Sequence, residues 1–251
     1  MTVHAEGTEI VTLTIDRPER RNAVDHATLD ALAAGVQRAV DGGARAIVLT
    51  GAGGHFCAGA DLTTLEDAGF ATVLRSVLDL FSSVPITTIA AIDGAALGAG
   101  TQLAISCDLR VATPTARFGI PAAKLGLMVD AATVQRLVAL AGASVARAML
   151  LAAETIDGEG AHRIGFVHRL GALDDARAWA ADIAALAWAR EIASLAPLTI
   201  AGHKLALERL APAPEADPLI AEAFARAWRS QDVREGQRAF HERRPPRFEG
   251  R

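Results

Sequence analysis

Apolar positions along the chain alternate between two spacings, which predicts strands and helices in turn. From Thr8 to Ile15 the run TEIVTLTI is rich in β-branched residues and stops at Asp16-Arg17-Pro18, as a strand followed by a turn does. The next apolar residues recur every three or four positions after Asp25, a residue type that often begins a helix. The short apolar run ARAIVLT, starting at Ala44, then predicts a buried strand.

The same alternation continues into the middle of the chain. The glycine-rich segment GAGGHFCAGADL leads to a helical pattern that places Phe70, Leu74 and Phe81 on one face. Next come the strand ITTIAAI, the small-residue turn DGAALGAG, the apolar helix TQLAISC and the strand DLRVA. Strands that alternate with helices predict an α/β fold.

From Asp130 onward the pattern is mostly helical, including the stretch Ala216 to Trp228. No low-complexity linker interrupts the chain. We therefore expect a core over residues 1–190 and a C-terminal helical region over residues 191–251.

Composition and charge exclude several classes of partner. The 251 residues are 51% hydrophobic with a net charge of −4, so no basic field predicts binding to nucleic acid or to an anionic membrane surface. The two cysteines lie far apart and no metal-ligand spacing occurs. The N-terminus lacks a secretory pattern, and no uninterrupted apolar stretch reaches about 18 residues. We expect a soluble, cytoplasmic protein without membrane insertion.

The two small-residue turns carry the candidate chemistry. Gly51 to Leu62 and Asp93 to Gly100 each lead from a strand into a helix through glycines and alanines. Small residues allow backbone N–H groups to approach a ligand closely, and a helix N-terminus favours negative charge. Two such turns facing each other could donate two N–H groups to one developing oxyanion. Each turn alone could equally be a tight turn without further function.

Both turns resemble the signature segments of a known family. HFCAGADL and AIDGAALGAGTQLAISCDLRV are similar to the two signatures of the crotonase, or enoyl-CoA hydratase/isomerase, superfamily. RPERRNAV near the start, FGIPAAKLGL in the middle, ETIDGEGAHRIGFVHRL later and SQDVREGQRAFHERRPPRF at the end all sit in family order. The resemblance therefore covers nearly the whole chain. It implies a spiral of ββα units, a C-terminal helical region that drives trimerisation, and a homotrimer or a dimer of trimers.

The resemblance also implies a ligand and its contacts. The ligand is an acyl-CoA or enoyl-CoA thioester, with coenzyme A as part of the substrate and no permanently bound cofactor or metal. The thioester oxygen would accept hydrogen bonds from the backbone N–H groups of Ala60 and Ala99. Coenzyme A would contact the residues of the first turn and two arginines before it, namely Arg20, Arg21, Ala58, Ala60, Asp61 and Leu62.

Two positions depart from the pattern of a hydratase. Hydratases of this family, a lyase class, use one glutamate in the helix after the second turn and one after the proline of the FGxPE-type segment. These positions hold Gln102 and Ala122 here. Glutamine can orient a water molecule but cannot exchange protons at ordinary pH, and alanine offers no polar group. A positioned acid or base contributes about 10² to 10⁴ in rate, so efficient hydration is not expected.

Asp130 is the one carboxylate between Phe118 and Leu137. Other branches of the family use an aspartate at the corresponding position, so it is a candidate acid/base. Its place before AATVQRLVAL equally predicts a helix N-cap, and one residue can do both.

Three functions therefore stay open, together with a scaffold that binds no small ligand. The first is binding of fatty acyl-CoA in lipid metabolism with little turnover, as in actinobacterial homologues that lack both glutamates and resemble this chain around GTQLAISCDLRV and KLGL. The second is double-bond isomerisation with Asp130 as the base. The third is weak hydration with a water oriented by Gln102. A lipid-synthesis enzyme that exchanges acyl-CoA with this protein is a further expected partner.

Overall fold

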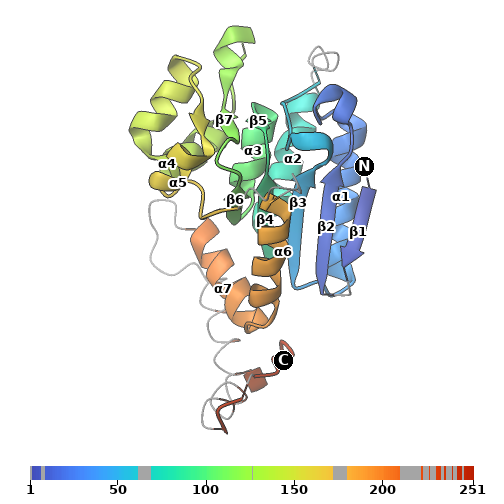
Figure 1. Ribbon diagram of the computed structural model, residues 1–251. Helices are drawn as coiled ribbons and strands as arrows, with labels where there is room; N and C mark the ends of the chain where they lie inside the picture. The colour runs from blue at the N-terminus through green and yellow to red at the C-terminus, as the bar shows by residue number, and fades with distance from the viewer. Residues whose placement is uncertain are drawn as a thin grey trace.

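The computed structural model describes most of the chain (Figure 1). The described residues are 2–6, 9–61, 69–125, 127–171 and 180–209, and in the C-terminal part 222, 226, 230–232, 235, 239, 242–244 and 246–251. Leu62 and most of the helix predicted over Ala216 to Trp228 lie outside them.

A mostly parallel sheet forms the centre of the described residues. Its order is β1-β2-β3-β4-β6-β9, and only the β1–β2 pair is antiparallel. The strands are β1 (Thr2–Glu6), β2 (Ile10–Ile15), β3 (Ala46–Gly51), β4 (Thr87–Ile92), β6 (Leu109–Ala112) and β9 (Arg169–Leu170). A second sheet joins β5 (Ala95–Leu97), β7 (Arg117–Gly119) and β8 (Ile156–Asp157). The sequence pattern predicted β2, β3, β4 and β6 but not β1.

Helices cover both faces of the large sheet. They are α1 (His26–Asp41), α2 (Phe70–Ser83), α3 (Ala99–Ser106), α4 (Ala131–Leu151), α5 (Gly158–Arg163), α6 (Ala180–Ala193) and α7 (Pro197–Glu208). Figure 1 shows α6 in front of the sheet, with α1 on its other side. Short 3₁₀ turns occupy Pro18–Arg20, Ala52–Gly54 and Pro121–Leu125.

Side-chain alternation along each strand separates two cores. In β3, Ile47 and Leu49 pack into the core formed with α1, α2 and α3, while Ala46 and Val48 pack under α6. The other long strands show the same two-residue alternation. A sheet covered on both faces explains why its strands are almost continuously apolar in sequence.

Two aspartates cap helices as the sequence predicted. The Asp25 carboxylate accepts a hydrogen bond from the Thr28 N–H at the start of α1 (2.8 Å). The Asp130 carboxylate does the same for the Thr133 N–H at the start of α4 (3.0 Å). Such caps satisfy N–H groups that have no partner within the helix. The N-cap prediction for both residues is confirmed.

Helix α4 is unusually apolar for its length. Over Ala131–Leu151 it is long and hydrophobic enough to cross a membrane, and α6 with α7 would pass the same test only if the 112° bend between them were ignored. Length and composition alone are weak evidence, because core helices of soluble proteins also meet them. The backbone of α4 leaves helical geometry at Gly142 (φ 79°, ψ 155°), so it is two shorter segments.

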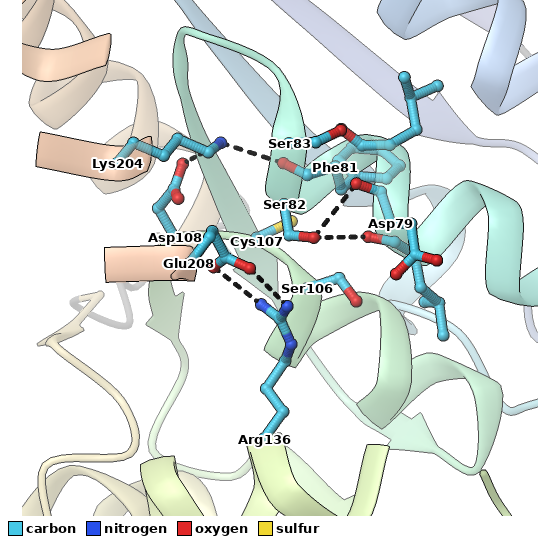
Figure 2. A network of polar contacts seen from close by, with 12 residues as sticks. Asp79, Phe81, Ser82, Ser83, Ser106, Cys107, Asp108, Arg136, Lys204 and Glu208 are labelled. Atoms are coloured by element: carbon cyan, nitrogen blue, oxygen red, sulfur yellow. Dashed lines mark hydrogen bonds and ion pairs between the residues drawn. The ribbon is translucent and has the colours of Figure 1, made fainter. Parts of the chain in front are cut away.

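Helix α7 contacts the core through the buried side chain of Lys204 (Figure 2). The Lys204 ammonium donates hydrogen bonds to the carbonyl oxygens of Phe81 and Ile86, both at 3.0 Å. It also pairs with the Asp108 carboxylate at 2.8 Å, and Figure 2 shows the contacts with Phe81 and Asp108. Lys204 is only 6% exposed. This contact joins α7 to the end of α2, the start of β4 and the start of β6.

A second ion pair connects α7 to α4. The Arg136 guanidinium binds the Glu208 carboxylate through two nitrogens, at 2.7 and 3.2 Å (Figure 2). Helix α7 thus supports α4, whose first turn carries Asp130. The predicted boundary between residues 190 and 191 falls inside α6, and the division into two regions stays a prediction.

We expect Lys204→Ala to lower the free energy of unfolding by about 3 kcal/mol, because Asp108 would lose its cation and two carbonyl oxygens their donor. Urea denaturation measures this change. Lys124→Ala is the matched control, since Lys124 is the only other lysine and is exposed; it should change stability by less than about 0.5 kcal/mol. Equal effects of the two substitutions would contradict a structural role for the Lys204 contact.

Candidate ligand-binding site

A cavity of about 970 Å³ lies between the two small-residue turns, α2 and the start of α4. Its lining is largely apolar and includes Phe70, Leu74, Ile120, Leu127, Met128 and Val129. Most residues predicted for the site line it, namely Arg20, Ala58, Ala60, Asp61, Ala99, Gln102, Ala122 and Asp130. Arg21 is exposed and is not one of the lining residues, and Leu62 lies outside the described residues.

The segment 17–22, before the first turn, is fixed by the side chains of Arg17 and Asn22, for which the sequence pattern predicted no role. Asn22 is fully buried in a left-handed conformation (φ 59°), and its amide donates to the Ala52 and His55 carbonyl oxygens. Arg17 pairs with Asp25 at 3.0 Å and with Asp61 at 3.2 Å. The Asp61 carboxylate, predicted to contact coenzyme A, is therefore engaged within the protein.

The Ala60 N–H is directed away from its neighbouring strand. The Val24 N–H donates to the Gly59 carbonyl (2.9 Å), and the Asp61 N–H donates to the Val24 carbonyl (2.8 Å). In extended backbone the next N–H along the chain points to the opposite side, so that of Ala60 points away from Val24. Among the described residues the Ala60 N–H makes no backbone hydrogen bond.

The Ala99 N–H also lacks an acceptor among the residues that the structure describes, for a different reason. Ala99 is the first residue of α3, and the first N–H groups of a helix have no partner within it. The preceding N–H, of Gly98, is already bonded to the Gly119 carbonyl (2.9 Å). Ala60 and Ala99 both line the cavity, so the two turns can donate to an oxygen atom that lies there.

Backbone contact between the turns requires glycine. The Cys57 N–H donates to the Ala95 carbonyl (2.8 Å), and the Leu97 N–H donates to the Cys57 carbonyl (3.0 Å). A Cβ on Gly100 would overlap the Cys57 carbonyl oxygen. A Cβ on Gly98 would lie 3.8 Å from the Gly59 Cα, and Gly98 has φ 54°. The small residues therefore bring two backbone segments into direct contact.

Gln102 and Ala122 both line the cavity. Gln102 is 6% exposed, and its Nε2 donates to the Thr133 hydroxyl at 3.0 Å. Ala122 lies in the 3₁₀ turn Pro121–Leu125 and contributes only a methyl group. Neither can accept and release a proton during catalysis.

Asp130 lines the cavity while its carboxylate is already bonded. It accepts from the Thr133 N–H and from the Thr133 hydroxyl (2.8 Å), and it pairs with Arg75 at 2.7 Å. Desolvation raises the pKa of Asp130, but the hydrogen bonds from Thr133 and the Arg75 guanidinium outweigh it, so the pKa lies below its ordinary value. Such a carboxylate stays ionised and is a weak base. Asp130 is thus both the N-cap of α4 and a lining residue of the cavity.

Comparison with known proteins assigns the chain to a family. The model of the enoyl-CoA hydratase/isomerase family matches residues 5–251, so the chain belongs to this family. A protein of Mycobacterium tuberculosis named "Probable enoyl-CoA hydratase echA6" is 45% identical over 244 residues, which cover 96% of each chain. The mitochondrial methylglutaconyl-CoA hydratase of Mus musculus is 34% identical, covering 98% of this chain and 81% of the relative.

Solved structures confirm the predicted crotonase-type α/β fold. An enoyl-CoA hydratase from Polaromonas sp. JS666 superimposes with a TM-score of 0.89 at 28% identity, covering 99% of both chains. The enoyl-CoA hydratase EchA1 from Mycobacterium marinum gives a TM-score of 0.85 at 32% identity, covering 100% of this chain and 98% of the other. The resemblance to actinobacterial homologues is likewise confirmed. Trimerisation through the C-terminal region stays a prediction.

We expect Gly100→Ala to weaken binding of any ligand in this cavity, because the new methyl group forces the start of α3 away from Cys57 and displaces the Ala99 N–H. The substitution should also lower the melting temperature by several degrees, as overpacking costs about 1–3 kcal/mol. Gly142→Ala is the control: Gly142 lies at the break between the two segments of α4, has φ 79°, and has open space around its Cβ position. It should lower stability through backbone strain and leave ligand affinity unchanged.

Proposed function

We propose that this protein binds fatty acyl-CoA thioesters and turns over enoyl-CoA slowly or not at all. The observation that carries the proposal is that one cavity combines two kinds of group. The N–H groups of Ala60 and Ala99 have no acceptor among the described residues, and the side chains of Gln102 and Ala122 cannot exchange protons. Membership of the enoyl-CoA hydratase/isomerase family supports a coenzyme A thioester as the ligand.

The two N–H groups would hold the thioester carbonyl oxygen. Two backbone donors fixed by the fold bind an oxygen that bears partial negative charge without reorganisation. The acyl chain would occupy the apolar part of the cavity beside α2, where Phe70 and Leu74 lie. Arg20, exposed at the cavity, is a cation for the phosphates of coenzyme A.

The described lining residues include no carboxylate that is free to transfer protons. Hydration requires one group to take a proton from water while the substrate α-carbon receives another. Of the two carboxylates among the described lining residues, Asp61 is bonded to Arg17 and Asp130 to Arg75 and Thr133. Binding can persist in such a site after hydration has slowed, because the two functions use different groups.

Isomerisation is the second candidate, since Asp130 lines the cavity and one carboxylate can move one proton between carbons. Its lowered pKa and its three donors weaken it as a base. A cytoplasmic location, assembly as a homotrimer or a dimer of trimers, and a lipid-synthesis enzyme as partner complete the proposal.

The purified protein should bind long-chain saturated and 2-enoyl-CoA saturably by calorimetry while the enoyl absorbance stays constant. The saturated thioester is the control for binding without chemistry. Absence of binding would overturn the proposal. Turnover that disappears in Asp130→Asn would favour the isomerase instead, because asparagine keeps the size of the side chain but not its basicity.

Restoring two carboxylates should restore hydration. We expect the double variant Gln102→Glu/Ala122→Glu to hydrate 2-enoyl-CoA at least about 10²-fold faster than the natural protein, the contribution typical of one positioned acid/base group. Gln102→Glu/Ala123→Glu is the matched control, since Ala123 is in the same 3₁₀ turn but is exposed and does not line the cavity. A natural protein as fast as the double variant would contradict the proposed loss of turnover.

A further inference from the structure

Four side chains form a continuous hydrogen-bonded chain that ends at the cavity wall. Arg75 of α2 pairs with the Asp130 carboxylate (2.7 Å), which accepts from the Thr133 hydroxyl (2.8 Å). The Thr133 oxygen lies 3.0 Å from the Nε2 of Gln102 on α3. The chain thus crosses from α2 through the first turn of α4 to α3.

The direction of each hydrogen bond in this chain is fixed by chemistry. An ionised carboxylate can only accept, and the Arg75 guanidinium keeps Asp130 ionised. Thr133 has one hydroxyl hydrogen, which it must donate to Asp130. Its oxygen can then only accept from Gln102, so the NH₂ end of the Gln102 amide faces Thr133. The reversed amide would place two acceptor oxygens against each other.

The carbonyl end of Gln102 has no donor within the described part of the chain. Gln102 lines both the large cavity and a cavity of about 10 Å³ behind it, whereas Thr133 lines only the small one. Among the described residues no group donates to the Gln102 Oε1. With its NH₂ end turned to Thr133, the amide has its oxygen on the side of the large cavity.

We propose that Thr133 is a positioning residue that makes Gln102 a hydrogen-bond acceptor toward the ligand, so that the site selects acyl thioesters carrying a hydroxyl group near the thioester. This inference rests on the proposed function. Gln102 lies three residues after Ala99 on α3, and residues at this spacing are neighbours about 5–6 Å apart on a helix. A donor in reach of Gln102 therefore lies close to the thioester carbonyl, as a hydroxyl on C3 does.

The test compares three thioesters of one chain length, namely saturated, 3-hydroxyacyl and 3-oxoacyl-CoA, by calorimetry. A 3-hydroxyl can donate to Gln102, whereas a 3-oxo group of nearly the same size can only accept. We expect the natural protein to bind the 3-hydroxyacyl thioester about 3- to 10-fold more tightly than the 3-oxoacyl thioester, as one net hydrogen bond provides. Thr133→Val should bring this ratio to about one, because the amide becomes free to rotate.

Two further variants separate positioning from a loss of stability. Thr133→Ser keeps the hydroxyl and should keep the ratio. Thr28→Val is the matched control, because Thr28 bonds the N-cap Asp25 through its N–H (2.8 Å) and hydroxyl (2.7 Å) as Thr133 bonds Asp130, but at α1. It should lower stability while the ratio stays unchanged.

The outcomes distinguish this inference from the proposed function. If no thioester binds, the proposed function fails and the inference fails with it. If the saturated thioester binds but the natural protein shows no preference for the 3-hydroxyacyl form, only the inference is overturned. A preference that persists in Thr133→Val would also overturn the inference, since Thr133 would then not determine the orientation of the Gln102 amide.

Discussion

Direct backbone contact between the turn at Cys57–Ala60 and the start of α3 is the constraint on which the site depends. Hydrogen bonds in both directions between Cys57 and the segment Ala95–Leu97 hold the turns together, and Gly100 leaves no room for a side chain. Because the contact is between main chains, the two free N–H groups of the cavity are positioned by the fold itself. The two N–H groups that we propose to bind a carbonyl oxygen are therefore positioned independently of the side chains that line the cavity.

That separation is consistent with the proposed function, in which the site binds a thioester without hydrating it efficiently. Under the proposed function, Gln102 and Ala122 offer no group that exchanges protons, while the backbone donors stay in place. The Asp130 carboxylate is bonded to Thr133 and Arg75. Helix α2 and the N-cap of α4 line part of the cavity, and both helices are bonded to α7. Lys204 of α7 binds α2, and Glu208 of α7 binds Arg136 of α4. Helix α7 thus contacts two elements that contribute to the cavity lining, although none of its described residues lines the cavity itself.

Local patterns in the sequence predicted much of the fold correctly. The runs TEIVTLTI and ITTIAAI became β2 and β4, and Asp25 and Asp130 became N-caps, because these outcomes depend on neighbours within a few residues. The strand β1 was missed, since its formation depends on antiparallel pairing with β2. Arg17, Asn22, Arg75 and Thr133 carried no local signal for their roles.

The sequence by itself predicted four strands of the large sheet, the helices between them and the small residues at both turns. It also showed Gln102 and Ala122 at the two positions where the family resemblance predicts glutamates. Only the tertiary structure decided what the remaining polar groups bind. Asp130 meets Arg75 from 55 positions away, and Gln102 meets Thr133 from 31 positions away. The physical reason is that a hydrogen bond requires its two atoms within about 3 Å in a fixed direction. Between separate helices, packing alone sets that distance and direction.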